Sequence, residues 1–297
     1  MHRPDISSHM ALFMVRYGEI ALKSPGVRKR FERVLGQNIA SRFEKSGKEC
    51  RIQVERGRIF LWSDDADFAA LAISRTFGVV SYSQVTETSS AREDIFRVAI
   101  EVSKQHFRKG TRFRVTARRS GQHDYTSMEL ARDTGSAVFL ANEALRPKVD
   151  LTHPELEIFV EVRQNRSYIY IGSEPGPGGM PLGTQGRMLG LVKKPRDIAA
   201  CWLMMKRGCR VIVVADDAAF AQGLTAWDQN LKVLVGEYSD IPKLARNRRA
   251  DGLCLGWGTD EFDSHGAEMV EMGMPMFYPL IGMGREEIDG LIARISA

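Results

Sequence analysis

Basic side chains gather in two stretches of the first half of the chain, at positions 23–30 and 112–119, and an imidazole and an aromatic ring follow the second stretch. The set comprises Lys23, Arg28, Lys29, Arg30, Arg112, Arg114, Arg118, Arg119, His123 and Tyr125. Lys and Arg bind backbone phosphates, and an aromatic ring can stack on an unpaired base. These residue types favour RNA contacts. The alternative is a structural role. The first stretch would then be a solvated helix face, and the second would contain a packed Tyr125 and a hydrogen-bonded His123.

The charge is divided unevenly along the chain. The net charge of the chain is +5. Residues 1–175 contain 28 Lys and Arg against 22 Asp and Glu, whereas residues 176–297 contain 14 Lys and Arg against 15 Asp and Glu. A basic region joined to a near-neutral one indicates a polyanion as the partner of the first. A solvated surface that is merely basic is the alternative reading.

The elements that must position the first stretch form a repeated pattern. We expect strands at 12–17, 50–55, 58–62 and 79–85 and helices at 27–43 and 68–76. The order strand, helix, strand, strand, helix, strand is typical of a ferredoxin-like split βαβ unit. The first helix would carry its basic residues at its start.

A second unit is expected to position the other basic stretch. It has helices at 95–107 and 127–142, with Ser127 as candidate N-cap, strands at 111–117, 156–162 and 167–171, and a polar basic loop at 118–123. The Gly- and Pro-rich segment 176–183 then breaks any regular element and is interpreted as a linker. Beyond it we expect helices at 197–207, 241–246 and 285–295 and strands at 210–215, 232–235 and 252–255, the alternation of a parallel α/β sheet.

The composition excludes several classes of protein. With 297 residues, 43% hydrophobic and 27% charged, the chain has the balance of a globular protein of about two domains. No run approaches the roughly 18 apolar residues of a membrane-spanning helix, and no secretory signal opens the chain. Four scattered cysteines without a Cys-x-x-Cys pair predict reduced thiols in a cytoplasmic protein. Residues 1–10 are polar and patternless, and we interpret them as a cloning remnant.

Three segments give the chain a resemblance to the tRNA 4-thiouridine synthetases, which also serve thiamine biosynthesis. They are Arg16–Lys23 with Arg28, Arg30, Phe31 and Asn38–Ile39; Phe113–Val115 with Arg118–Arg119, Ser127–Leu130, Gly135, Val149–Leu151 and Val160–Val162; and Gly176–Thr184. The resemblance implies a ferredoxin-like domain at 11–88, a THUMP domain at 89–173, a linker at 174–191 and an α/β domain related to ATP pyrophosphatases at 192–297. THUMP domains bind the acceptor end of tRNA, so it implies tRNA as partner.

The phosphate loop that this family carries reads Ser-Gly-Gly-x-Asp-Ser, and this chain departs from it. Lys193–Ile198 stands there, and only Asp197 is retained, as a weak catalytic candidate. Lys194 and Pro195 replace the glycines, and proline offers no N–H to a phosphate. We expect a degenerate loop in which Lys193, Lys194 and Arg196 attract a phosphate only as point charges.

Sulfur transfer also needs a reactive cysteine. Cys254 lies in an apolar run and is expected to be an inert core thiol, and the acidic cluster at 260–263 is expected to be a solvated turn without a metal. The sequence thus predicts a tRNA-binding protein of tRNA thiolation or thiamine sulfur chemistry, without its own adenylation activity or cofactor. It would act with a sulfur-carrier protein or partner enzyme. The alternative is an active tRNA sulfurtransferase that uses ATP, Mg²⁺ and an external persulfide donor.

Overall fold

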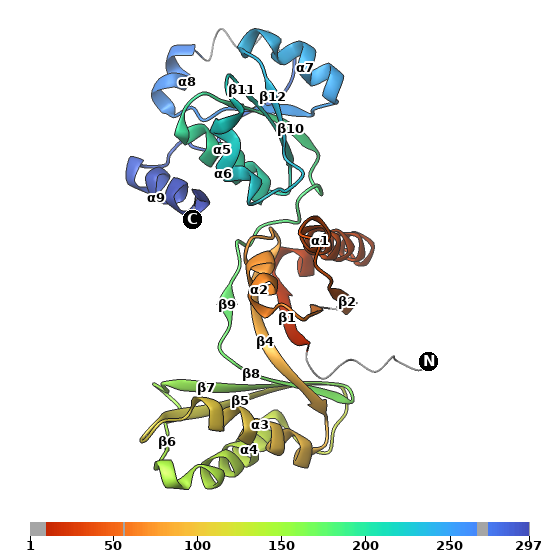
Figure 1. The fold of residues 1–297 in the computed structure, drawn as a ribbon, viewed down its shortest axis with the longest axis vertical. Helices are drawn as coiled ribbons and strands as arrows, with labels where there is room; N and C mark the ends of the chain where they lie inside the picture. The colour runs from red at the N-terminus through yellow and green to blue at the C-terminus, as the bar shows by residue number, and fades with distance from the viewer. Residues whose placement is uncertain (1–9, 56, 266–272, 297) are drawn as a thin grey trace. The chain divides into compact units, whose positions relative to one another are not determined.

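The computed structural model describes residues 10–55, 57–265 and 273–296. Its internal contacts divide the chain into two compact units, which are interleaved in sequence. The first unit holds the described residues up to 15 together with 60–69 and 81–174. The second holds 16–59, 70–80 and the chain from 175 onward. Figure 1 shows the elements of each unit along the chain.

A nine-stranded sheet is built from the first 175 residues, in the order β2-β3-β1-β4-β8-β7-β5-β6, with β9 paired to β4. Its strands are β1 (Ala11–Tyr17), β2 (Arg51–Glu55), β3 (Arg58–Ser63), β4 (Val79–Ser89), β5 (Arg112–Ser120), β6 (Lys148–Val149), β7 (Leu156–Arg163), β8 (Arg166–Ile171) and β9 (Glu174–Pro175). β4 extends beyond the expected 79–85, because residues 86–89 pair antiparallel with β8 although they are polar.

The ferredoxin-like part forms as the apolar spacing predicts. Its helices are α1 (Pro25–Lys45) and α2 (Ala66–Ser74). Proline at the first position suits a helix start, and Phe31, Leu35, Ile39 and Phe43 bury one face of α1 at four-residue spacing. This leaves the basic residues at the start of α1 facing solvent.

Arg118 and Arg119, expected in a loop, lie on the strand β5 together with Arg112 and Arg114. β5 continues to Ser120 because it pairs in parallel with β7 along its whole length, with Arg118 opposite Glu161 and Arg119 opposite Val162. Two helices, α3 (Arg92–His106) and α4 (Ser127–Ala141), pack on this part of the sheet. Ile95, Val98, Phe113, Leu130, Val138, Ile158 and Val160 are among the residues of their shared core.

The N-cap of α4 is Thr126, so the prediction of Ser127 was wrong by one residue. Thr126 Oγ1 accepts the N–H of Glu129 at 3.1 Å, and Glu129 Oε2 accepts the N–H of Thr126 at 2.8 Å. This reciprocal pair is a capping box, which satisfies two N–H groups that a helix start leaves free.

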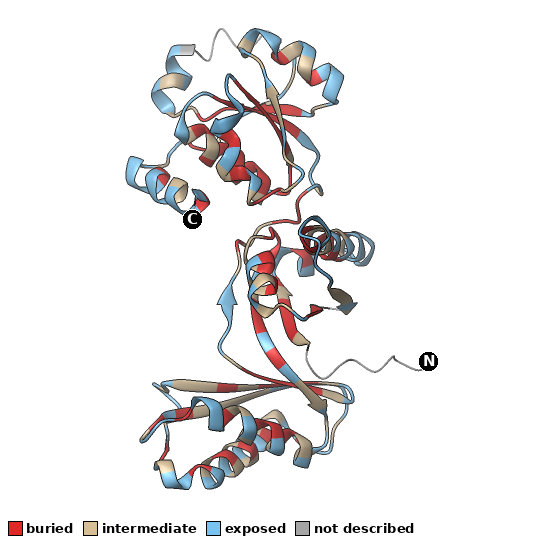
Figure 2. Cartoon of the chain, in the orientation of Figure 1, coloured by how far each residue is buried: buried red, intermediate tan, exposed pale blue. Residues whose placement is uncertain are grey.

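The C-terminal region is a five-stranded parallel sheet in the order β12-β11-β10-β13-β14. Its strands are β10 (Arg187–Val192), β11 (Arg210–Ala215), β12 (Lys232–Val235), β13 (Gly252–Cys254) and β14 (Met276–Phe277). Its helices are α5 (Pro195–Lys206), α6 (Gln222–Thr225), α7 (Ile241–Arg248), α8 (Thr259–His265) and α9 (Arg285–Ser296). Figure 2 shows the buried residues of this region gathered on α5 and the central strands.

Two expectations for this region are corrected. Residues 187–191, expected to lie in the linker, form most of β10, because they pair with both β11 and β13. Gly190 lowers the strand propensity of this segment. The packing of α5 nevertheless requires glycine at this position, since a Cβ on residue 190 would lie 2.5 Å from Cys201 Sγ. The acidic cluster at 260–263 lies on the helix α8 and not in a turn. Within the described residues, no helix combines the length and the hydropathy needed to cross a bilayer.

Candidate nucleic-acid interface

Of the basic residues at the start of α1, Arg28 and Lys29 line an open groove, to which Glu32 and Glu55 also contribute. Lys23, Lys29 and Arg30 are exposed and Arg28 is half-buried, with Arg28 Nε 3.9 Å from Glu32 Oε1. The groove between α1 and β2 has a volume of about 680 Å³, and Arg28, Lys29 and Arg33 line it together with the apolar Ile52 and Val54. Such a surface offers several cations to a backbone of phosphates.

A buried pair fixes the orientation of this helix face. The Tyr17 hydroxyl donates to Glu32 Oε1 and accepts the N–H of Gly57 at 2.8 Å. Burial first, and then the bond and charge of Glu32, raise the pKa of Tyr17 to about 12. The Tyr17 hydroxyl therefore stays protonated at neutral pH and keeps its hydrogen bond to Glu32.

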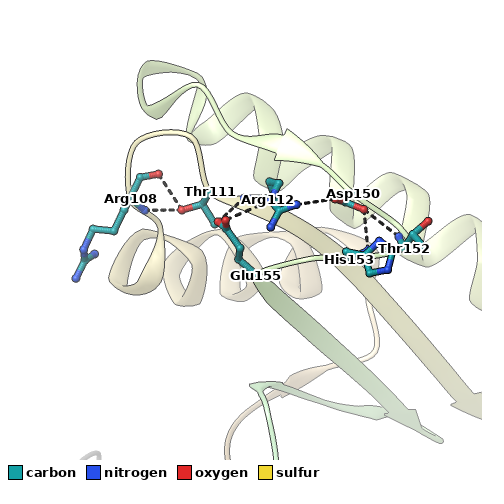
Figure 3. A network of polar contacts seen from close by, with 7 residues as sticks. All are labelled: Arg108, Thr111, Arg112, Asp150, Thr152, His153 and Glu155. Atoms are coloured by element: carbon teal, nitrogen blue, oxygen red, sulfur yellow. Dashed lines mark hydrogen bonds and ion pairs between the residues drawn. The ribbon is translucent and has the colours of Figure 1, made fainter.

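Arg112 and Arg114 are bound within the protein. Arg112 Nε lies 3.2 Å from Glu155 and its Nη1 lies 3.5 Å from Asp150, as Figure 3 shows. Arg114 Nη2 lies 2.7 Å from Glu157 and Nη1 donates to the carbonyl of Leu151 at 3.1 Å. Both arginines hold the segment after β6 against β5, so their charge is largely neutralised.

The carboxylates of this network are themselves held by the backbone. Asp150 Oδ1 accepts the N–H groups of His153 at 2.8 Å and Thr152 at 3.0 Å, which lower its pKa below the ordinary range. The hydrogen bond from the backbone N–H of Arg112 is the largest cause that lowers the pKa of Glu155, and the bond from the Arg112 side chain is the next. Asp150 and Glu155 thus stay ionised, and the network in Figure 3 shapes the turn between β6 and β7.

Arg118 and Arg119 remain as exposed cations at the end of β5. Arg119 Nη1 donates to the carbonyl of Gly121 at 3.1 Å, and the side chain of Arg118 has no hydrogen bond or ion pair within the described chain. Their side chains are therefore open to a ligand. Of the second basic stretch, these two fit a phosphate contact best.

The structure contradicts the expected stacking role of Tyr125. Its ring is 3% exposed, its hydroxyl donates to the carbonyl of Ser90 at 2.8 Å, and the guanidinium of Arg92 lies 5.1 Å from the ring centre. Burial, as the largest cause, raises the pKa of the Tyr125 hydroxyl. His123 stacks on this ring at 5.3 Å and its Nε2 lies 3.3 Å from the carbonyl of Ser120. Tyr125 is a packed core residue that shapes the loop.

An apolar groove between α4 and β5–β6 was missed by the sequence reasoning. It has a volume of about 830 Å³. Its exposed apolar residues are Met128 (83% exposed), Leu140 (68%), Val149 (58%) and Leu151 (71%), with Arg114 and Arg132 beside them. Exposed apolar patches of this kind mark binding surfaces. The sequence feature that indicates this groove is Met128, an apolar residue in the otherwise polar first turn of α4.

The expected phosphate site at the start of α5 is filled from within the chain. The N–H groups of Lys193 and Lys194 both donate to Asp197 Oδ2, each at 2.8 Å. Asp197 is 7% exposed; burial raises its pKa, and the two N–H bonds oppose that rise. A Cβ on Gly256 would lie 2.0 Å from Asp197 Oδ1, so the backbone closes over the carboxylate.

The cations of this segment are paired as well. Lys193 Nζ contacts Asp216 Oδ1, Lys194 Nζ lies 3.8 Å from Glu261 Oε1, and Arg196 Nη1 lies 3.0 Å from the same oxygen. Glu261 belongs to α8, and its pKa is lowered by the N–H of Gly258 and by these cations against the effect of burial. The segment is therefore close to neutral as a whole.

Three of the four thiols are buried in the C-terminal region. Cys254 and Cys201 are 0% exposed, and the neighbouring Cys201 thiol together with burial raises the pKa of Cys254 well above its ordinary value. Cys209 Sγ donates to the carbonyl of Gln185 at 3.4 Å. A thiol of raised pKa is a poor nucleophile. In the described part of the chain, no three His, Cys, Asp or Glu residues cluster as a metal site would require.

Comparison with known proteins finds two domain families that match this chain. Residues 12–83 match the ThiI ferredoxin-like domain, and residues 90–172 match the THUMP domain. A probable tRNA sulfurtransferase of Methanosarcina acetivorans is 34% identical over 95% of this chain and 80% of its own length. That of Methanothermobacter thermautotrophicus is 40% identical over 77% of this chain and 59% of its own length.

Two solved structures share the fold of this chain. The crystal structure of PH1313 from Pyrococcus horikoshii superposes with a TM-score of 0.84 and 30% identity, covering 97% of this chain and 100% of the other. A 4-thiouridine synthetase in complex with RNA and ATP shares the fold, with a TM-score of 0.81 at 20% identity over 96% of this chain and 85% of the other.

Proposed function

The chain belongs to the tRNA sulfurtransferase family, and from this premise we propose that it binds tRNA for thiolation without adenylating the tRNA itself. The observation that carries the proposal is the Asp197 carboxylate seated on the N–H groups of Lys193 and Lys194. The proposed tRNA-binding part comprises the ferredoxin-like domain at 11–88 and the THUMP domain at 89–173. The linker at 174–191, shortened by the start of β10, leads to the degenerate α/β domain.

Two kinds of surface support tRNA binding. Arg118, Arg119 and the cations at the start of α1 offer charge for the phosphates of a duplex stem. The groove lined by Met128 and Leu151 offers an apolar surface for unpaired bases. The acceptor end of a tRNA combines both features, a stem that continues into an unpaired strand. We propose that this end occupies the THUMP surface, defined here as Arg118, Arg119 and the apolar groove lined by Met128 and Leu151.

The filled helix start argues against ATP-dependent adenylation. An ATP phosphate would need the N–H groups that Asp197 occupies, and it would meet a carboxylate of like charge there. Pro195 contributes no N–H, and the neighbouring cations are already bound to Asp216 and Glu261. On this proposal, activation and sulfur delivery come from a partner enzyme or a sulfur-carrier protein.

The alternative is an active tRNA sulfurtransferase that takes ATP with Mg²⁺ and an external persulfide donor. The parallel sheet of the C-terminal region favours it, because the ATP-bound 4-thiouridine synthetase has the same fold. In that case the Asp197 carboxylate would have to leave the N–H groups when ATP binds.

Calorimetric titration of ATP, with and without tRNA, separates the two functions. We expect tRNA binding that weakens steeply with salt and no heat from ATP. Arg118→Ala combined with Arg119→Ala should weaken tRNA binding, whereas Arg97→Ala combined with Lys104→Ala removes the same charge from the exposed face of α3 as a control. Heat on ATP addition together with thiolated uridine from ATP, tRNA and a persulfide donor would establish the alternative.

A further inference from the structure

A second cationic groove lies at the amino ends of the parallel strands, on the C-terminal region. Its volume is about 400 Å³, and five cations and one carboxylate line it: Arg187, Arg210, Lys232, Arg248, Arg249 and Asp228. Arg187, Arg210 and Lys232 are the first residues of β10, β11 and β12. The parallel register places these strand starts side by side, with Arg187 opposite Arg210. The topology therefore gathers cations that are distant in sequence.

Most of the charge in this groove is not neutralised within the protein. Asp228 is 5% exposed and pairs with Arg210 at 3.4 Å. Arg187 Nη1 donates to the carbonyl of Arg248 at 2.7 Å, and the exposed Asp251 accepts the backbone N–H of Arg187 at 2.8 Å. Lys232, Arg248 and Arg249 are exposed and have no side-chain ion pair within the described residues. The cations at the start of α5, by contrast, are all paired.

The backbone at Arg249 allows the charge of this residue to be removed without cost to the fold. Arg249 closes α7 with φ 51° and ψ 52°, in the left-handed region. Glycine is the residue that helices favour at such a position, because a Cβ is disfavoured there. Arg249 stands at this site with an exposed side chain, so glycine in its place would remove the charge and relieve the backbone.

The chemistry of the groove fits a phosphate backbone better than a small anion. The C-terminal end of α7 directs carbonyl groups toward Arg187, so no row of N–H groups converges on one point here. The cations stand on flexible side chains, each able to meet a separate phosphate. We propose that this groove, here called the amino-edge groove, binds the backbone phosphates of RNA, as a contact additional to the THUMP surface. The proposal rests on the proposed tRNA binding.

The test measures tRNA affinity of the full chain against salt concentration. Lys232→Ala combined with Arg249→Gly removes two charges, and glycine suits the backbone at 249, so the melting temperature should be unchanged or higher. Arg285→Glu is the matched control, because it changes the net charge by the same amount on an exposed side chain of α9. We expect the double variant to bind roughly tenfold more weakly at low salt and to reduce the salt slope by about 1 to 2.

Each outcome bears on one of the two proposals. If the double variant behaves as Arg285→Glu does while Arg118→Ala with Arg119→Ala weakens binding, the amino-edge groove does not contact RNA and the proposed function stands. If the wild type binds no tRNA at low salt, both fail. If the double variant loses affinity for pyrophosphate but keeps its affinity for tRNA, the groove is a small-anion site and the inference is overturned. Slower amide exchange at 246–251 upon tRNA addition supports the inference.

Discussion

The carboxylate of Asp197 decides what the start of α5 can bind. It lies at the start of α5 and accepts the N–H groups of Lys193 and Lys194, which directly precede the helix, each at 2.8 Å. Because an internal carboxylate is tethered, it competes with a dissolved phosphate at a very high effective concentration. On the proposed function, this one residue keeps the start of α5 closed to a phosphate.

Replacing Asp197 with Asn changes the pH dependence of folding. Burial raises the pKa of Asp197 above 3.8 in the folded protein, so the folded state holds its proton to a higher pH than the unfolded chain does. The free energy of unfolding of the wild type should therefore fall, relative to the Asn variant, as the pH rises from about 3.5 through the raised pKa. Urea unfolding of both proteins at several pH values measures this difference. A difference that does not change with pH contradicts the prediction.

Tyr17 and Glu32 give a second prediction at the residue scale. Tyr17→Phe leaves the buried Glu32 carboxylate without its hydroxyl donor, and we expect a loss of about 1–3 kcal/mol in the free energy of unfolding. Tyr278→Phe is the control, since that hydroxyl bonds only a thioether at 3.6 Å and should cost less. The ultraviolet difference spectrum of wild type minus Tyr17→Phe should titrate at about 12. A midpoint near 10 would show that the pair does not exist in solution.

At the scale of elements, α4 supports the THUMP surface and depends on its first turn. The capping box between Thr126 and Glu129 sets where the helix begins, which in turn places Met128 at the edge of the apolar groove. The hydrogen bond from the N–H of Thr126 is the largest cause that lowers the pKa of Glu129. The Glu129 carboxylate is therefore ionised at neutral pH and accepts this bond.

Thr126→Ala should therefore destabilise the protein by about 1 kcal/mol, because an N–H group of α4 loses its acceptor. Ser127→Ala is the matched control: it removes a hydroxyl one residue later, where the sequence placed the cap and the structure does not. We expect little change in that variant. Chemical denaturation measures both, and an equal loss in the two would mean that Thr126 is not the cap.

At the scale of the whole molecule, the surfaces that suit RNA are separate from the buried clusters that hold the fold. The C-terminal core packs Phe77, Trp202 and Trp227 with ring centres 5.2–5.4 Å apart. The apolar groove at α4 leaves comparable side chains exposed. Apolar surface left open next to cations is what an RNA with both paired and unpaired segments can use.

A tRNA without its unpaired 3′ residues should bind about tenfold more weakly than the complete molecule, because those bases lose the apolar groove. Met128→Asp should weaken binding of complete tRNA and abolish this difference, while an acidic residue in the first turn of α4 leaves the fold intact. Val235→Asp, which places the same charge on another exposed apolar residue, is the control. If Met128→Asp leaves the difference between the two tRNAs unchanged, the unpaired end binds elsewhere.

Much of the fold could be predicted from local patterns. The strands at 210–215 and 232–235 were predicted with the ends that the structure has, because each is a short apolar run between breaks. The polarity of Arg118 and Arg119 predicts a loop and gives no sign of the pairing with β7. The sequence around Asp197 indicates only a remnant of a catalytic loop, because the bond of Asp197 to two N–H groups depends on the three-dimensional course of the turn.

The family resemblance, the order of elements and the excess of positive charge in the first 175 residues follow from the sequence, because they depend on residues near one another in the chain. Which of these charges a ligand can reach depends on the folded structure. Arg112 and Arg114 are neutralised by Asp150, Glu155 and Glu157, some 40 positions further along, while Arg187, Arg210 and Lys232 gather at one sheet edge. The strength of a charge at a surface depends on its neighbours in space, and those are set by strand pairing.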